Sequence, residues 1–318
     1  MNQTSNRPYY SSNSIYSLSA LSKALGFEES FLAELAAIAN TKYRLAKAIT
    51  KPDGSIRQPF DAEEPLKEVH RRIKNEIFSK VVFPNYLTGS LKGCDYKVNA
   101  SLHTNAKIVI CEDVEGFFPA TKTTQVFDIW RNFFGFSEDV ANILTILTTK
   151  DDALPQGAIT SSYLANLTFW RLEPDIHELL AIQDIRYSRY VDDITISSTK
   201  HLDAARKTEC IALIYGMLSK SGYRAKRRKH EITTSANQMF TTKLMVNKKP
   251  SLTSKERANI RASVYQLEQK ISMGLIEPSI AKLFNSVSGQ VGKLSRFHPT
   301  EGNKLKLRIK LIRQKLEP

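Results

Sequence analysis

The sequence is poor in cysteine and lacks long apolar segments. Its 318 residues include three cysteines, Cys94, Cys111 and Cys210, with no CxxC pair and no histidine–cysteine cluster at zinc spacing. Neither a disulfide framework nor a structural zinc site is therefore indicated. No apolar run approaches the length that spans a membrane, and the polar N-terminal stretch lacks the apolar core of a secretory signal. We expect a cytoplasmic protein with no membrane partner.

Acidic residues are outnumbered by basic ones. The 46 lysines and arginines against 32 aspartates and glutamates give a formal net charge of +14 and an isoelectric point near 9.6. Such an excess favours a polyanionic partner, commonly nucleic acid, although a generally basic protein without such a partner has the same composition. Hydrophobic residues make up 42% of the chain, which is ordinary for a globular protein and enough for a buried core.

Two adjacent aspartates, Asp192 and Asp193, stand between short runs rich in β-branched residues in the stretch 188–197 (SRYVDDITIS). This pattern predicts a β-hairpin with the acidic pair at its tip. Neighbouring carboxylates repel one another unless a cation neutralises them, and Mg²⁺ is suited to carboxylate oxygens. A solvated acidic turn is the alternative that these residues leave open.

A third aspartate follows a predicted buried strand. Residues 108–111 form a continuous apolar run that leads directly to Asp113, and a strand can hold such a side chain rigidly at its solvent-facing end. On an antiparallel sheet, Asp113 and the pair at 192–193 can meet at one point and hold two Mg²⁺ ions for an in-line phosphoryl displacement. A nuclease or a non-catalytic acidic pocket fits the same residue types.

The order of predicted elements indicates an α+β protein in three parts. Residues 1–14 are rich in serine and asparagine and are predicted to be a flexible arm. Residues 15–250 mix helices and strands, including one predicted helix over about 160–180. Residues 251–318 are predicted to be helical and carry many lysines and arginines.

Three motifs in a fixed order resemble those of reverse transcriptases. They are residues 113–118 (DVEGFF), 154–157 (LPQG) and 190–193 (YVDD), and the resemblance covers roughly residues 43–250. It implies a right-hand polymerase in which residues 15–250 form the fingers and an antiparallel-sheet palm. Residues 251–318 would form a helical thumb that binds RNA or duplex.

The resemblance also implies roles for individual residues in the chemistry. Asp113 and Asp192 would hold two Mg²⁺ ions, with Asp193 supporting them and the backbone carbonyl of Val114 as an extra ligand. Lys229 would protonate the leaving pyrophosphate. From its own sequence context, Lys229 is one member of a basic run at 226–230.

Further roles concern the incoming deoxynucleotide. By the resemblance, Lys51 and Arg57 in the segment KPDGSIR would clamp its phosphates, and Gln156 would pack on it. Tyr190 would position the primer end. Phe118 would lie under the sugar and exclude a ribose hydroxyl, whereas the neighbouring Phe117 is expected in the core.

Within this family the sequence resembles bacterial retron enzymes. Residues 99–103 (NASLH) are similar to their asparagine-alanine-x-x-histidine motif, whereas Thr241-Thr242-Lys243 replaces their usual valine-threonine-glycine. The resemblance implies that a dedicated structured non-coding RNA is copied into single-stranded DNA. That DNA stays joined to the RNA through priming from an RNA 2′-OH. It further implies anti-phage defence with an effector protein encoded nearby.

Recognition of that RNA is expected from two regions, the NASLH segment and the basic helices. The candidates are Asn99, His103, Lys255, Arg257, Arg261, Lys293, Arg296 and Lys304. Three alternatives stay open at this point: another defence-associated bacterial reverse transcriptase, a non-catalytic RNA-binding scaffold of polymerase fold, and a polymerase that uses ribonucleotides.

Overall fold

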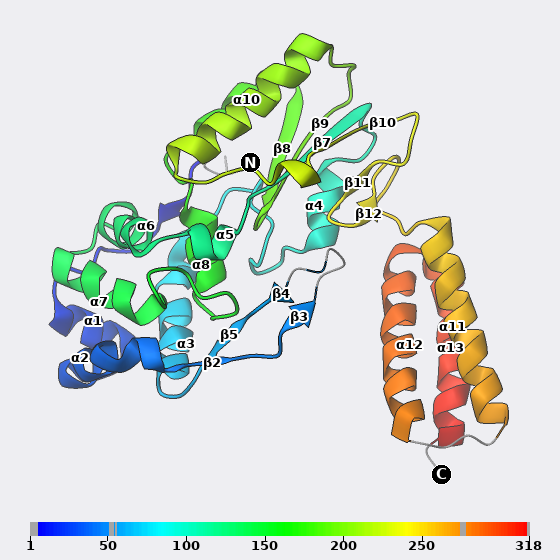
Figure 1. Ribbon diagram of the computed structural model, residues 1–318, viewed down its shortest axis with the longest axis horizontal. Helices are drawn as coiled ribbons and strands as arrows, with labels where there is room; N and C mark the ends of the chain where they lie inside the picture. The colour runs from blue at the N-terminus through cyan, green and yellow to red at the C-terminus, as the bar shows by residue number, and fades with distance from the viewer. Residues whose placement is uncertain (1–5, 51–53, 55, 274–277, 317–318) are drawn as a thin grey trace.

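Four antiparallel strands form the central sheet of the computed structural model, which describes residues 6–50, 54, 56–273 and 278–316 (Figure 1). Their order across the sheet is β10 (Glu231–Thr234), β7 (Ile108–Asp113), β9 (Asp193–Ser198) and β8 (Ile185–Tyr190). Strands β8 and β9 are joined by a two-residue turn, because Tyr190 pairs with Asp193. The predicted hairpin is thus confirmed.

Both faces of the sheet are covered, which explains why β7 is apolar at successive positions. Ile110 faces a core shared with Ile214 and Met217 of α10 (Ala204–Lys220), and α9 (Glu173–Ala181) packs on β8 on the same side. Val109 points the other way, into a second core. That face is covered by α4 (Tyr96–Leu102) and by the hairpin of β11 (Phe240–Thr241) and β12 (Leu244–Met245).

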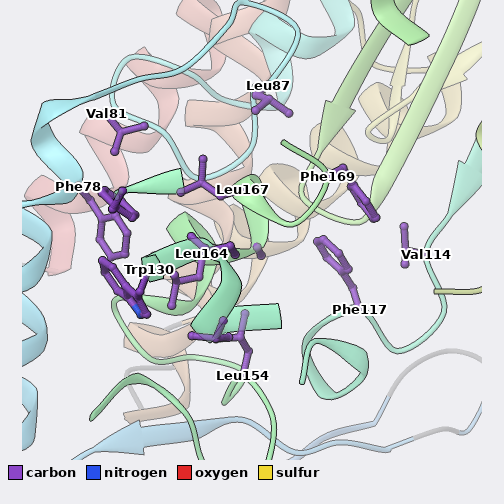
Figure 2. Close-up of a cluster of buried hydrophobic side chains, with 14 of the residues drawn as sticks. Phe78, Val81, Leu87, Val114, Phe117, Trp130, Leu154, Leu164, Leu167 and Phe169 are labelled. Atoms are coloured by element: carbon purple, nitrogen blue, oxygen red, sulfur yellow. The ribbon is translucent and has the colours of Figure 1, made fainter. Parts of the chain in front are cut away.

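Helices between residues 18 and 167 build much of the largest apolar core. Figure 2 shows part of it, with Trp130 beside Phe78 and with Phe117 beside Phe169. The elements around it are α1 (Leu18–Leu25), α2 (Glu29–Ile38), α3 (Leu66–Glu76), α5 (Phe117–Ala120), α6 (Thr123–Asp128), the π-helical turn Ile129–Phe133, α7 (Glu138–Thr148) and α8 (Ser161–Leu167).

The predicted helix over about 160–180 is two helices, α8 and α9. Pro174 stands in the first turn of α9, where its missing N–H is tolerated; in a continuous helix it would interrupt the hydrogen-bond ladder. The break also places Glu173 in the interior, with 1% of its surface exposed.

The predicted flexible arm is corrected for its described residues. Tyr9 and Tyr10 form β1, which pairs with β6 (Val81–Val82), and the Tyr10 ring lies 5.0 Å from that of Phe134. Asn6 donates a hydrogen bond to the carbonyl of Pro174 at 3.1 Å. This segment therefore belongs to the folded core.

Two short antiparallel strand pairs, one nested within the other in sequence, lead into α3 (Figure 1). Strand β2 (Tyr43–Leu45) pairs with β5 (Phe60–Ala62), and β3 (Ile49–Thr50) pairs with β4 (Ile56–Arg57). The Phe60 N–H donates to the carbonyl of Gln156 at 2.7 Å. This bond ties the pair β2–β5 to the turn at 154–157.

Three helices follow the β11–β12 hairpin: α11 (Ser254–Ser272), α12 (Pro278–Phe297) and α13 (Pro299–Leu316). Their apolar faces share one core with Leu244 and Val246, so the hairpin packs with the bundle as well as with the sheet. None of the described helices is both long and apolar enough to cross a membrane.

Candidate active site

The turn between β8 and β9 carries unusual backbone geometry. Val191, the first of its two residues, has a φ of +61°, in the region that glycine favours and that a β-branched residue rarely adopts. Glycine is also preferred at this position of the two-residue hairpin turn whose first residue has positive φ. The turn therefore needs its surroundings to hold it.

The three predicted aspartates come from this turn and from the end of β7. Asp113 lies directly opposite Asp193 in the sheet, and the Val114 N–H donates to the carbonyl of Asp192 at 3.0 Å. Burial, followed by the charges of Asp192 and Asp113, raises the pKa of Asp193 to about 7. The ammonium group of Lys229 contacts the Asp113 carboxylate.

A cavity of about 430 Å³ collects the predicted residues of the nucleotide pocket. Asp113, Val114, Asp192 and Lys229 line it, together with Phe118 and Gln156. Tyr190 lines a neighbouring cavity with Asp192, Asp193 and Phe118, and Phe117 is buried in the core as expected. Lys51 and the side chain of Arg57 lie outside the described residues.

The donor set of the first cavity fits a divalent cation by its chemistry. Two carboxylates and the Val114 backbone offer hard oxygen ligands of the kind that Mg²⁺ prefers. The like charges that raise the pKa of Asp193 are those a bound cation would offset. Among the described residues, however, no three acidic, histidine or cysteine side chains form a preassembled metal cluster.

Asn99 lies on α4 and His103 is the C-cap residue that follows it. Both are completely buried, so the prediction that they contact RNA is corrected. His103 bonds through its two ring nitrogens to Ser197 Oγ at 2.8 Å and Ser188 Oγ at 2.7 Å. The Asn99 amide accepts from Ser188 and donates to Thr241 Oγ1 at 3.2 Å. The NASLH segment therefore joins the hairpin β8–β9 to β11.

This network predicts a pH dependence of stability. Burial, with a smaller contribution from the charge of Arg186, lowers the pKa of His103 to about 3. Below pH 6.5 the unfolded chain therefore binds a proton that the folded chain does not, and stability falls as pH falls. For His103 this amounts to about 2 kcal/mol between pH 8 and pH 5.

Urea unfolding of wild type and His103→Gln at these two pH values checks the expectation. The loss of stability on acidification should be about 2 kcal/mol smaller in the variant, because glutamine does not titrate. His201→Gln, at an exposed histidine, is the matched control. Equal pH dependence in wild type and His103→Gln would contradict the expectation.

Four of the six basic residues predicted to bind RNA are paired with acidic groups of the protein itself. Arg257 and Arg261 contact Glu301, Lys293 contacts Glu256 at 2.7 Å, and Arg296 contacts Asp95. Lys293 also lines the cavity that holds Tyr190. The other two, Lys255 and Lys304, are exposed.

The pair Arg189 and Glu173 was not anticipated. Both side chains are buried, and they meet through two hydrogen bonds of 2.6 and 2.8 Å. Burial alone would lower the pKa of Arg189, but the charge of Glu173 outweighs it and raises the pKa. The sequence signal that could have predicted this burial is the alternation of side chains along a strand. Arg189 falls on the same face of β8 as the buried Ile185 and Tyr187.

The chain matches the family of reverse transcriptases (RNA-dependent DNA polymerases) over residues 49–261. It is 35% identical over 297 residues to the retron Se72 reverse transcriptase of Salmonella heidelberg (strain 579083-10), covering 92% of this chain and 78% of that protein. It is 32% identical over 327 residues to the retron Ec48 reverse transcriptase of Escherichia coli, covering 96% and 79%. The chain belongs to the retron reverse transcriptases and is an RNA-directed DNA polymerase.

Proposed function

We propose that this polymerase copies a dedicated structured RNA into single-stranded DNA that remains joined to the RNA, with synthesis primed from an RNA 2′-OH. Residues 15–250 serve as fingers and palm, and residues 251–318 serve as the thumb. The observation that carries the proposal is the convergence of Asp113, Asp192, Phe118 and Gln156 on one cavity, beside Tyr190.

Asp113 and Asp192, with the carbonyl of Val114 and support from Asp193, are the residues that would hold two Mg²⁺ ions. When bound, these ions activate the attacking hydroxyl and neutralise charge on the phosphates. The rigid end of β7 fixes Asp113, and the backbone bond from Val114 fixes Asp192 beside it. The protein thereby fixes the backbone from which both carboxylates project.

Lys229 acts as the proton donor to the leaving pyrophosphate. Burial opposes its charge, but the hydrogen bond and charge of Asp113 prevail and raise its pKa, so the ammonium form is present at neutral pH. Half of its side-chain surface is exposed, and it lines the same cavity as Gln156. It can therefore reach a phosphate bound there while staying protonated.

Phe118 is proposed to exclude ribonucleotides. It is half-buried and lines both cavities, so its ring can lie against the sugar of a bound nucleotide. Phe118→Ala should accept ribonucleotides at least ~10-fold better relative to deoxynucleotides, because the removed ring leaves room for the 2′-OH. The measurement is the kcat/KM ratio for dCTP and CTP. Phe136→Leu, at a buried ring that lines neither cavity, is the control and should keep the wild-type ratio. A wild-type ratio in Phe118→Ala would contradict the proposed contact between its ring and the sugar.

The proposed partners are the RNA, its DNA product, deoxynucleotides and an effector protein encoded nearby. We place them together in an anti-phage defence system that acts in the cytoplasm. The basic bundle would bind RNA through phosphate and 2′-OH contacts. Lys255 and Lys304 are the exposed candidates. Arg257, Arg261 and Arg296 would have to exchange an internal carboxylate for a phosphate.

The test is to purify the protein from cells that carry its native locus and to sequence the nucleic acid that accompanies it. Wild type should yield one abundant DNA joined to one small RNA, and an Asp192→Asn/Asp193→Asn variant should yield the RNA without DNA. Heterogeneous or unlinked DNA, lost in the variant, would indicate another defence-associated class of template. RNA without DNA in both samples would favour a scaffold.

A further inference from the structure

Arg189 lies behind the Tyr190–Asp193 turn, and its guanidinium makes contacts in three directions. It donates to both carboxylate oxygens of Glu173, to the carbonyls of Asn166 at 2.9 Å and Ala165 at 3.3 Å, and to the carbonyl of Val191 at 3.1 Å. The side chain is fully buried. A buried ion pair is weak evidence of a stabilising role, since apolar replacements are often at least as stable.

The Val191 contact is the informative one, because Val191 holds the turn's unfavourable φ of +61°. The backbone of Gly89 packs closely against the amide nitrogen of Val191, since a Cβ built on Gly89 would lie 2.4 Å from that nitrogen. The Gly89 carbonyl accepts from the Asn166 side chain at 2.8 Å, and the Asn166 carbonyl accepts from Arg189. The turn is therefore held from both sides by one connected set of groups.

We propose that Arg189 is a positioning residue for DNA synthesis, oriented by Glu173, which holds Val191 in its left-handed conformation so that Asp192 faces the cavity. The inference rests on the proposed role of Asp192 in holding the metal. A strained backbone conformation persists only where its surroundings over-determine it. Without the guanidinium, Val191 relaxes toward negative φ and the next residue, Asp192, turns away from Asp113.

The decisive variant removes the buried polar cluster without leaving an unpaired charge. Tyr187 donates to Glu173 at 2.6 Å, so the triple variant Arg189→Met/Glu173→Leu/Tyr187→Phe replaces all three groups with apolar ones of similar size. Its kcat for deoxynucleotide incorporation on a primed RNA template should fall about 10- to 100-fold. The KM for deoxynucleotide should change less than about threefold, because Gln156 and Phe118 are untouched.

A second substitution separates positioning from general support of the fold. Glycine adopts positive φ without strain and suits this turn position. In a Val191→Gly background, removal of the cluster should therefore lower kcat less than about fivefold, a smaller loss than with valine. Equal losses in both backgrounds, or a folded triple variant with wild-type kcat, would overturn the proposal.

Two controls complete the experiment. Arg171→Met/Asp128→Asn removes a two-bond ion pair that lies outside both cavities of the site and outside the bundle, and it should keep wild-type kcat. Wild-type synthesis that is lost in Asp192→Asn establishes the catalytic site independently of Arg189, so failure of the two proposals can be distinguished.

Arg189→Lys is the alternative variant if the triple variant does not fold. Lysine keeps the charge but cannot reach Glu173 and Val191 together, so kcat should fall by the same factor. Wild-type kcat in Arg189→Lys would overturn the proposal.

Discussion

Asp192→Asn should lower the rate of deoxynucleotide incorporation by on the order of 10³-fold or more, while the protein stays folded. The substitution keeps the size of the side chain and removes the negative charge that would hold the cation beside Asp113. The Val114 bond to residue 192 is made by the backbone and should survive. The measurement is single-turnover incorporation on a primed RNA template over a range of Mg²⁺ concentrations.

The same substitution lowers activity but should not lower the stability of the folded protein. The charge of Asp192 contributes to the raised pKa of Asp193, so the carboxylates repel one another when no cation is bound. Without Mg²⁺, Asp192→Asn should therefore unfold at the same urea concentration as wild type or a higher one. Such a site gives up stability for function.

Asp184→Asn is the matched control for Asp192→Asn. Asp184 is exposed and directly precedes Ile185, the first residue of β8, at the end of the strand away from the site. Its φ is +58°, a conformation that asparagine tolerates. Its ion pair with Lys200 is exposed and contributes little, so activity should match wild type. Asp192→Asn with more than about a tenth of wild-type activity at saturating Mg²⁺ would contradict an essential role for this carboxylate.

Local pattern was sufficient to predict the strands of the site. The β-branched runs on either side of Asp192 and Asp193 predict a hairpin, and the structure has it with Tyr190 paired to Asp193. The apolar run before Asp113 predicts a buried strand, which β7 is. In both cases the signal lies within about ten residues, the range over which alternation and turn preference operate.

Partners distant in sequence could not be predicted in the same way. Arg296 and Asp95 are 201 positions apart and form an ion pair, so the charge count of the basic helices overstated the charge available to RNA. Asn99 and His103 carry polar groups that suggest a surface, yet both are satisfied inside by hydroxyl groups of β8, β9 and β11. Burial of a polar group depends on partners that only the fold brings near.

Gly157→Ala should destabilise the protein by about 2–5 kcal/mol, a second large effect that originates in the backbone. Gly157 has a φ of +112°, and a Cβ there would lie 2.5 Å from the carbonyl oxygen of Phe60. Phe60 is the residue whose N–H bonds to Gln156, so relief of the overlap breaks the link between β5 and the turn at 154–157. Gln156 and Phe60 line the same cavity, so the KM for deoxynucleotide should rise as well.

Urea unfolding and steady-state kinetics of Gly157→Ala test both expectations, with Gly216→Ala as the matched control. Gly216 lies within α10, and a Cβ there meets nothing within 4 Å. That change should stabilise the protein by about 0.5–1 kcal/mol, because alanine is the better helix former, and should leave the KM unchanged. If Gly157→Ala were as stable as wild type, the turn would have to tolerate both the added atom and the unfavourable φ. The close approach of residues 60 and 157 would then not be what holds Gln156 at the cavity.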